Sequence, residues 1–213
     1  LQLGLSITIN TNGVTSFFNE WTLKELARHA RLSVQVSLDG DEAMHDAIRG
    51  PDSCRKAVRT LRKLVEHGIR CSVSTTVVDV DFMARADAFI ASLDMLGLAH
   101  IAIKRATYAG RAASGVNVDG KKWNEHVYRL RALPTKTRLK MKPMYDFDRL
   151  DELSDDVLAA LELPPSATNC GAGTAKVYVY TNGDVCPCTC FKDRPMGNLY
   201  RSDLDVILTK PPS

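Results

Sequence analysis

Hydrophobic and polar positions follow two different periods along the first half of the chain. Four stretches have the alternating, β-branched pattern of strands, over residues 5–10, 32–40, 69–78 and 99–107. Between them, apolar residues recur at helical spacing over residues 19–30, 53–66 and 81–96. Gly68 follows the second of these helices as its expected C-cap. The segment DEAMHDAIRGPDS, residues 41–53, is predicted to be a polar loop.

This alternation of strands and helices with short connections predicts an α/β fold. Parallel strands would form a wall with the helices outside it. Four strands are fewer than a closed barrel needs, so we expect a partial, TIM-like (β/α) barrel over residues 1–115. The chain opens on LQLGLSITINTNG, without an initiator Met, and we expect it to be cut from a larger protein whose first strands precede Leu1.

The pattern loosens after residue 115. A helix is predicted over 121–133, the basic run KTRLKMK (136–142) is a strand or a linker, and a second helix is expected over 150–163. We group residues 116–165 as a helical and linker segment. Residues 166–213 form a third part, in which KVYVY is followed by Asn182-Gly183, a pair typical of β-hairpin turns. A small Cys-rich hairpin module is therefore predicted behind the α/β part.

Composition narrows the class of protein. The 213 residues are 45% hydrophobic and 25% charged, which suits a globular protein with a sizeable core. No apolar run approaches the roughly 18 residues that cross a membrane, so we expect no membrane partner. The net charge of +3 is too small to indicate nucleic-acid binding. Without a secretory signal, a reduced, cytoplasmic setting is expected.

The six cysteines fall into two groups. Cys54 lies in a helical pattern and Cys71 in a strand pattern, and both are predicted to be small buried hydrophobic residues. The other four flank the predicted hairpin: Cys170, Cys186, Cys188 and Cys190. A hairpin brings its two ends together, so these sulfurs should lie close to one another. Cys-x-Cys spacing is awkward for disulfides, and no histidine is near in sequence. The group therefore favours iron–sulfur ligation, with four-thiolate zinc or structural and redox thiols as alternatives.

Several segments resemble radical S-adenosylmethionine enzymes with a C-terminal SPASM or twitch extension. They are TINTNG, VSLDGDEAMHDAIRGPDS, YAGRA and NCGAGTAKVYVYTNGDVCPC with MGNLY behind it, and they stand in the order of that family. Within the last segment, Cys170, Gly183, Cys188 and Gly197-Asn198 match the first half of the SPASM pattern.

The chain also departs from that family. The Cys-x-x-x-Cys-x-x-Cys loop that holds the catalytic cluster is absent, as are the Gly-Gly-Glu strand end and the later SPASM Cys-x-x-Cys. We expect the first two upstream of Leu1. The chain alone is therefore expected not to cleave S-adenosylmethionine.

The resemblance implies roles for individual residues. Thr11 and Ser37 would lie near the carboxylate of S-adenosylmethionine, with a strand-end or turn-forming role as the alternative for each. Asp39 and Arg49 would lie on the same cofactor side, Asp39 also fitting a turn residue and Arg49 a solvated loop charge. The four clustered cysteines would hold an auxiliary [4Fe-4S] cluster.

The function implied by the resemblance is that of a maturase. It would act by hydrogen abstraction through a deoxyadenosyl radical on a peptide or protein side chain, with an external electron donor. The alternative is a non-catalytic peptide- or partner-binding protein with structural zinc or an iron–sulfur site. Because a partial barrel exposes strand edges, we also expect either a homo-oligomer or pairing with a missing N-terminal half. The basic run 136–142 is either a solvated face or a site for an acidic peptide.

Overall fold

The protein consists of two compact units, residues 1–146 and 147–213. A computed structural model describes residues 6–78, 80–106, 118–142, 172–173 and 176–209. Each unit is described by itself below.

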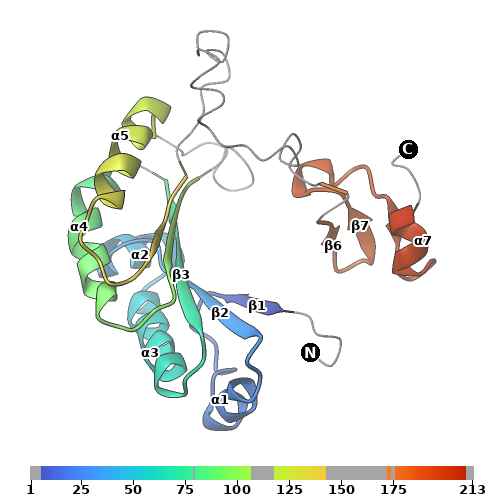
Figure 1. Ribbon diagram of the computed structural model, residues 1–213, viewed down its shortest axis with the longest axis horizontal. Helices are drawn as coiled ribbons and strands as arrows, with labels where there is room; N and C mark the ends of the chain where they lie inside the picture. Colours follow the sequence, from blue (N-terminus) through green and yellow to red (C-terminus); the bar gives the residue numbers. More distant parts are fainter. Residues whose placement is uncertain (1–5, 79, 107–117, 143–171, 174–175, 210–213) are drawn as a thin grey trace. The chain divides into compact units, whose positions relative to one another are not determined.

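A parallel sheet of five strands organises the first unit (Figure 1). Its strands stand side by side in chain order: β1 (Ile7–Thr11), β2 (Leu32–Ser37), β3 (Cys71–Val77), β4 (Ile101–Arg105) and β5 (Leu139–Lys140). All four neighbouring pairs are parallel. The predicted α/β class with parallel strands is confirmed. The fifth strand lies in the basic run 136–142, for which the sequence allowed either a strand or a linker.

Helices cover one face of this sheet. They are α1 (Glu20–Ala27), α3 (Ser53–Glu66), α4 (Asp81–Asp94) and α5 (Gly120–Arg131), while the short α2 (Glu42–Arg49) follows the carboxyl end of β2 (Figure 1). In β2, buried Leu32, Val34 and Val36 alternate with less buried polar residues. The apolar side chains of one sheet face and of the helices form a continuous core. A one-sided core of this kind leaves the other face of the sheet available for polar side chains.

Side-chain caps explain where several helices begin. Asn19 Oδ1 accepts a hydrogen bond from Thr22 N at the start of α1. Asp41 caps α2 through Met44 N in the same way. Such caps satisfy amide groups that would otherwise lack a partner in the first turn.

The prediction of a polar loop over residues 41–53 was wrong, because α2 occupies Glu42–Arg49. Its two large apolar residues, Met44 and Ile48, are spaced four apart, but three charged residues outnumber them in this eight-residue helix. The helix forms where Asp41 caps its first turn and His45 is buried. A short amphipathic segment with a polar buried residue carries little helical signal in its hydrophobic pattern.

Gly13 is required at the turn that follows β1. Its φ of 74° lies in the left-handed region, and a Cβ there would stand 2.9 Å from Val36 Cγ1 and 3.0 Å from Ala57 Cα. The turn therefore packs directly against β2 and α3. Thr60 Oγ1 donates to Gly13 O at 2.6 Å and fixes this approach.

The second unit contains an antiparallel sheet of three short strands. The elements are β6 (Tyr178–Val179), β7 (Asp184–Cys186), a 3-10 turn η4 (Thr189–Phe191), β8 (Gly197–Asn198) and helix α7 (Leu204–Thr209). The predicted hairpin is confirmed by the β6–β7 pairing. Tyr180 N donates to Asp184 O, Gly183 N donates to Tyr180 O, and Gly183 has φ 84°. These bonds define a tight turn with glycine in the left-handed bulge position.

Some predictions lie outside the described residues. These are the helix over 150–163, the segment YAGRA, and the boundaries at 115 and 165 of the three-part division. The helix expected over 121–133 is confirmed as α5. Within the described residues, none of the helices has the length and apolar character needed to span a membrane.

Candidate functional site

A row of small polar side chains crosses the sheet face opposite the core. The parallel register places Asn10 beside Gln35, and Ser37 beside Ser74. Paired residues of neighbouring strands share a face, and alternate residues along one strand share it too. Thr8 Oγ1 and Ser33 Oγ lie 2.9 Å apart on this face, and Gln35 Nε2 lies 3.5 Å from Ser72 Oγ. The strands therefore present hydroxyls and amides where the helices leave the sheet uncovered.

The two predicted hydroxyl residues occupy different faces. Ser37 belongs to the polar row at the carboxyl end of β2. Thr11 pairs with Val36, a fully buried core residue, and its Oγ1 accepts a hydrogen bond from Gly13 N at 3.1 Å. The described contacts of Thr11 are thus those of a turn former, the alternative role that the sequence offered. Asn10 occupies the last polar-face position of β1 instead.

Asp39 and Arg49 contact each other. Asp39 is 4% exposed, and its Oδ2 accepts from Arg49 Nε at 2.5 Å. Its other oxygen, Oδ1, accepts from Thr76 N at 2.9 Å. The carboxylate therefore bridges the ends of β2 and β3 and ties α2 to both. Asp39 is not bonded to its own backbone as a simple turn residue would be.

His45 completes this connection from inside α2. Its ring is fully buried, and Nδ1 accepts a hydrogen bond from Asp39 N at 3.0 Å. Burial lowers the pKa of His45, against the opposing charge of Asp39, so the ring is neutral at pH 7. Since Nδ1 accepts, the proton of the neutral ring stands on Nε2, for which the structure shows no hydrogen-bond partner among its described residues.

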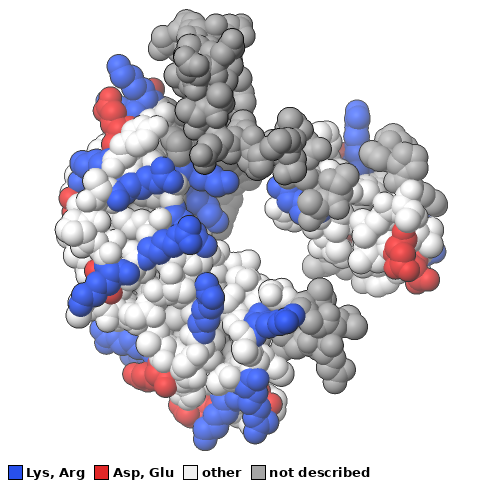
Figure 2. Space-filling model, viewed as in Figure 1, with Lys and Arg blue, Asp and Glu red and all other residues white. Residues whose placement is uncertain are grey.

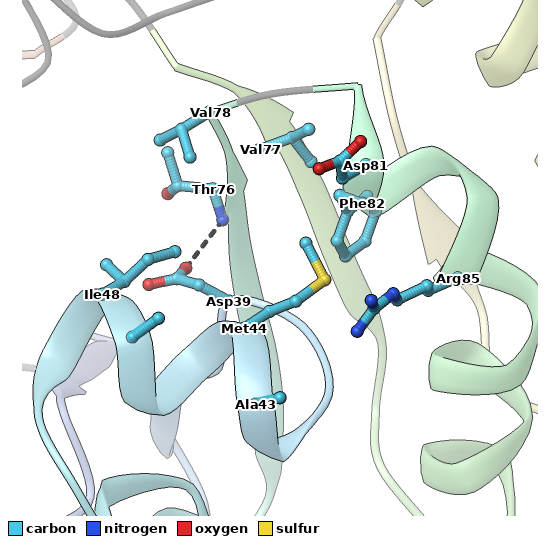
Figure 3. A pocket seen from close by; sticks show the side chains of 11 residues that line it. Asp39, Ala43, Met44, Ile48, Thr76, Val77, Val78, Asp81, Phe82 and Arg85 are labelled. Carbon is cyan, nitrogen blue, oxygen red and sulfur yellow. Dashed lines mark hydrogen bonds between the residues drawn. The ribbon is translucent and has the colours of Figure 1, made fainter.

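A cavity of about 310 Å³ opens beside this cluster (Figure 3). Met44 and Ile48 of α2 face Phe82 of α4 across it, and Asp39 lies on its wall next to Thr76. Arg85 lies at the α4 side (Figure 3), and its Nη1 donates to Asp41 Oδ2 at 3.1 Å. The walls are mainly apolar, so this cavity suits a hydrophobic group better than a charged one.

The hairpin of the second unit positions the described cysteines of the predicted cluster. Cys186 ends β7 opposite Tyr178, is fully buried, and its thiol lies 3.7 Å from Lys192 O. Burial raises the pKa of Cys186, and the charges of Asp184 and Asp193 add to this shift. Cys188 is half-buried two residues further on. Cys170 and the side chain of Cys190 lie outside the described residues, so the four-cysteine ligand set stays a prediction.

The two remaining cysteines have structural roles, as predicted. Cys54 is 7% exposed and Cys71 is 2% exposed, and both belong to the core of the first unit. Burial is the main cause that raises the pKa of each thiol to about 11. Protonated thiols in an apolar core are poor metal ligands.

Comparison with known families decides the nature of the second unit. The family SPASM, described as an iron–sulfur cluster-binding domain, matches residues 170–213. The match covers most of the Cys-rich part of the chain. The description of this family indicates an iron–sulfur cluster rather than zinc, and the resemblance to radical S-adenosylmethionine enzymes with a SPASM domain is confirmed.

Relatives agree with this assignment. Over 110 residues, which are 51% of this chain and 29% of the relative, the sequence is 34% identical to "Mycofactocin maturase MftC" of Mycobacterium ulcerans (strain Agy99). SuiB of Streptococcus suis aligns with 99% of this chain and 50% of its own, at a TM-score of 0.78 and 17% identity. The structure titled "Native anSMEcpe with bound AdoMet" aligns with 96% of this chain and 57% of its own, at a TM-score of 0.68 and 16% identity.

At these low identities, the solved structures show that the chain shares their fold. SuiB has also been solved bound to S-adenosylmethionine and to its precursor peptide SuiA. The chain spans about half the length of these solved structures, and less than a third of MftC. Activity and substrate are therefore matters for the proposal below.

Sequence reasoning missed the polar row and the bridging role of Asp39. A signal for the row was present, since Ser33, Gln35 and Ser37 alternate with the apolar residues of β2. The contacts of Asp39 join residues that are 10 and 37 positions apart. No local pattern contains such pairs.

Proposed function

We propose that this chain is part of a radical S-adenosylmethionine enzyme that modifies a peptide or protein side chain. Its auxiliary [4Fe-4S] cluster would lie in the SPASM domain. The observation that carries the proposal is the SPASM match at residues 170–213 behind a parallel sheet with a polar, uncovered face. The similarity to MftC, a maturase, supports the choice of a peptide substrate.

The donor set fits an iron–sulfur cluster. Four cysteines flank one hairpin, and thiolates are the ligands that iron–sulfur clusters use. Cys186 and Cys188 follow the hairpin turn within the domain's described part. We assign Cys170, Cys186, Cys188 and Cys190 as the ligands. Burial raises the pKa of the Cys186 thiol, whereas a bound cluster would lower it, because iron binds the deprotonated thiol.

The polar face fits S-adenosylmethionine. When bound, this cofactor would supply hydrogen abstraction from the substrate. Ser37 and Asn10 would orient its charged methionine end through neutral hydrogen-bonding groups, which add no titrating charge. Asp39 and Arg49 already neutralise each other, so we propose that they act through the position of the β2 end rather than as free charges.

The cluster can be tested on this chain alone. The reaction has to be tested on the protein that the gene encodes. Anaerobic reconstitution with iron and sulfide should give a brown protein with broad absorbance at about 400 nm. The gene-encoded protein, given S-adenosylmethionine, reductant and a candidate peptide, should change the mass of that peptide. A colourless, zinc-containing product, or S-adenosylmethionine cleavage with every peptide unchanged, would contradict the proposal.

A further inference from the structure

A basic cavity lies in the first unit, next to the polar row, whose Gln35 also lines it. Its volume is about 850 Å³, within the range of about 300–1,000 Å³ typical of ligand sites. The lining includes six Lys or Arg side chains and no Asp or Glu: Lys104, Arg105, Arg131, Arg138, Lys140 and Lys142. Positive charge is therefore concentrated at this cavity, although the net charge of the whole chain is only +3.

These cations come together only in the folded chain. Lys104 belongs to β4, Arg131 ends α5, and Arg138 and Lys140 lie at β5, the last strand of the sheet. Figure 2 shows Lys and Arg side chains along the face where α5 and the segment leading to β5 lie in Figure 1. The cavity therefore adds the charge of β4 and α5 to the basic run that the sequence displayed.

Three of these cations form no ion pair with another described residue. Lys104, Arg138 and Lys140 are exposed and take part in none of the ion pairs found there. Asp94 contacts the segment that leads to β5, but its carboxylate accepts from backbone amides there, from Lys136 N at 3.0 Å and Thr137 N at 2.6 Å. Uncompensated like charges repel one another, and an anionic ligand would relieve that repulsion.

The titration of His100 agrees with a positive environment. Burial is the main cause that lowers the pKa of His100, and Lys140, Arg70, Arg138 and Lys104 lower it further. His100 lines the cavity and is neutral at pH 7, so it adds a hydrogen-bonding group there and no charge.

The floor of the cavity distinguishes between anionic ligands. Leu139 is half-buried and contributes apolar surface, while Ile103 and Met141 also line the cavity but are almost fully buried. The indole of Trp123 is 1% exposed, and its Nε1–H already donates to Lys142 O at 2.9 Å. The cavity therefore has no accessible Trp face on which a base could stack, whereas such platforms are usual in single-stranded nucleic-acid sites. Carboxylates alternating with apolar side chains fit both the rim and the floor.

We propose that this cavity binds an acidic segment of the peptide substrate, with Lys104, Arg138 and Lys140 pairing with its carboxylates. The identification of the ligand as substrate rests on the function proposed above; the binding site itself does not. The segment would hold the peptide at the β5 edge, and Gln35, which lines the cavity and belongs to the polar row, connects the two.

A binding measurement with charge-neutral variants tests the site. The probe is a short fluorescent peptide in which Glu alternates with Leu, and its control has Gln in place of Glu. The cavity variant combines Lys104→Gln, Arg138→Gln and Lys140→Gln. The matched control combines Lys56→Gln, Arg59→Gln and Arg62→Gln, three exposed positions on α3 that remove the same charge. Circular dichroism melting checks that both variants are folded.

The wild type and the α3 variant should bind the acidic peptide, and binding should weaken in about 0.5 M salt. The cavity variant should bind about tenfold more weakly, as expected for the loss of three partly screened ion pairs. The Gln peptide should not bind the wild type.

Three results would overturn the proposal. They are no binding by the wild type, equal binding by the cavity variant, and displacement of the peptide by a single-stranded oligonucleotide of equal charge at an equal or lower concentration. The assay needs neither iron nor S-adenosylmethionine. If the peptide binds but the gene-encoded enzyme modifies no peptide, the proposed function fails and the site stands.

Discussion

Asp46 shows how one side chain can start a helix to which it does not belong. The N-cap of α3 is Asp52, whose φ is 65° and whose side chain makes no capping bond. Asp46 of α2 takes over this role, accepting from Asp52 N at 2.7 Å, Cys54 N at 2.8 Å and Ser53 Oγ at 3.0 Å. The Cys54 amide is the main cause that lowers the pKa of Asp46 below its ordinary 3.8.

We therefore expect Asp46→Asn to destabilise the first unit. Asparagine keeps one acceptor oxygen but lacks the negative charge that accepts hydrogen bonds from three donors. The melting temperature should therefore fall by about 2–4 °C at pH 7. Because the folded-state pKa lies below the unfolded one, the contribution of Asp46 is present at neutral pH and is lost as pH falls through and below 3.8. The difference between wild type and variant should therefore shrink in acid.

Glu66→Gln is the matched control, since Glu66 is an exposed carboxylate at the end of the same helix. Its melting temperature should match that of the wild type at both pH values. A loss for Asp46→Asn that stays constant from pH 7 to pH 3 would show that the charge has no role in capping.

Single cysteine substitutions should lower the bound iron only where the cysteine belongs to the proposed cluster. Cys186→Ala or Cys188→Ala should lower the iron bound after reconstitution to half or less and reduce the absorbance at about 400 nm. Cys54→Ala should leave iron content unchanged, because its thiol is buried in the core of the first unit. Equal iron loss in all three variants would indicate general unfolding rather than loss of a ligand.

At the scale of elements, long periodic segments were predictable and short ones were not. The four strands and three helices of the first half carry their own alternation and were found from it. α2 was missed because its eight residues bury His45 and expose charges around Met44 and Ile48. β5 has two residues, and only its pairing with β4 identifies it as a strand.

The cofactor role expected for Asp39 and Arg49 stays a prediction. The structure brings the two residues into contact, which the sequence did not predict. The face of Thr11 depends on where β1 ends and on its register with β2. A shift of one residue moves a side chain to the opposite face of a sheet, so sequence alone could not assign it.

The contact between β8 and α7 should be sensitive to one methyl group. A Cβ on Gly197 would stand 2.7 Å from Ile207 Cγ1, while Gly197 pairs with Val185 in β7. Gly197→Ala should therefore force α7 away and destabilise the SPASM domain by about 1–3 kcal/mol. Hydrogen exchange of the Ile207 amide, which donates to Asp203 O, reports the change locally.

A double-mutant cycle with Ile207→Ala separates this clash from a general preference for glycine. The double variant should be less destabilised than the sum of the single variants, with a coupling of about 0.5–3 kcal/mol, because the new methyl group enters the space that Ile207 vacates. Strict additivity would show that the close approach of Gly197 and Ile207 does not limit the domain.

At the scale of the whole molecule, the two units differ in what stabilises them. In the first, a continuous apolar core lies between the sheet and the helices. In the described part of the second, the buried apolar residues are Val185, Cys186 and Ile207. A unit of residues 147–213 is small enough that a metal commonly supplies part of its stability. We therefore expect an iron–sulfur cluster bound there to contribute to the stability of this unit.

Iron removal should accordingly unfold one unit and spare the other. Because cluster binding and folding are linked, the apo protein should lose amide protection in β6, β7 and β8. β2 and β3 should keep their protection, since their neighbours and core contain no proposed ligand. Hydrogen exchange with mass spectrometry on reconstituted and chelator-treated protein measures both units in one sample. Retained protection of the β6–β7 hairpin without iron would mean that the hairpin folds first and presents Cys186 to the cluster as a preformed ligand.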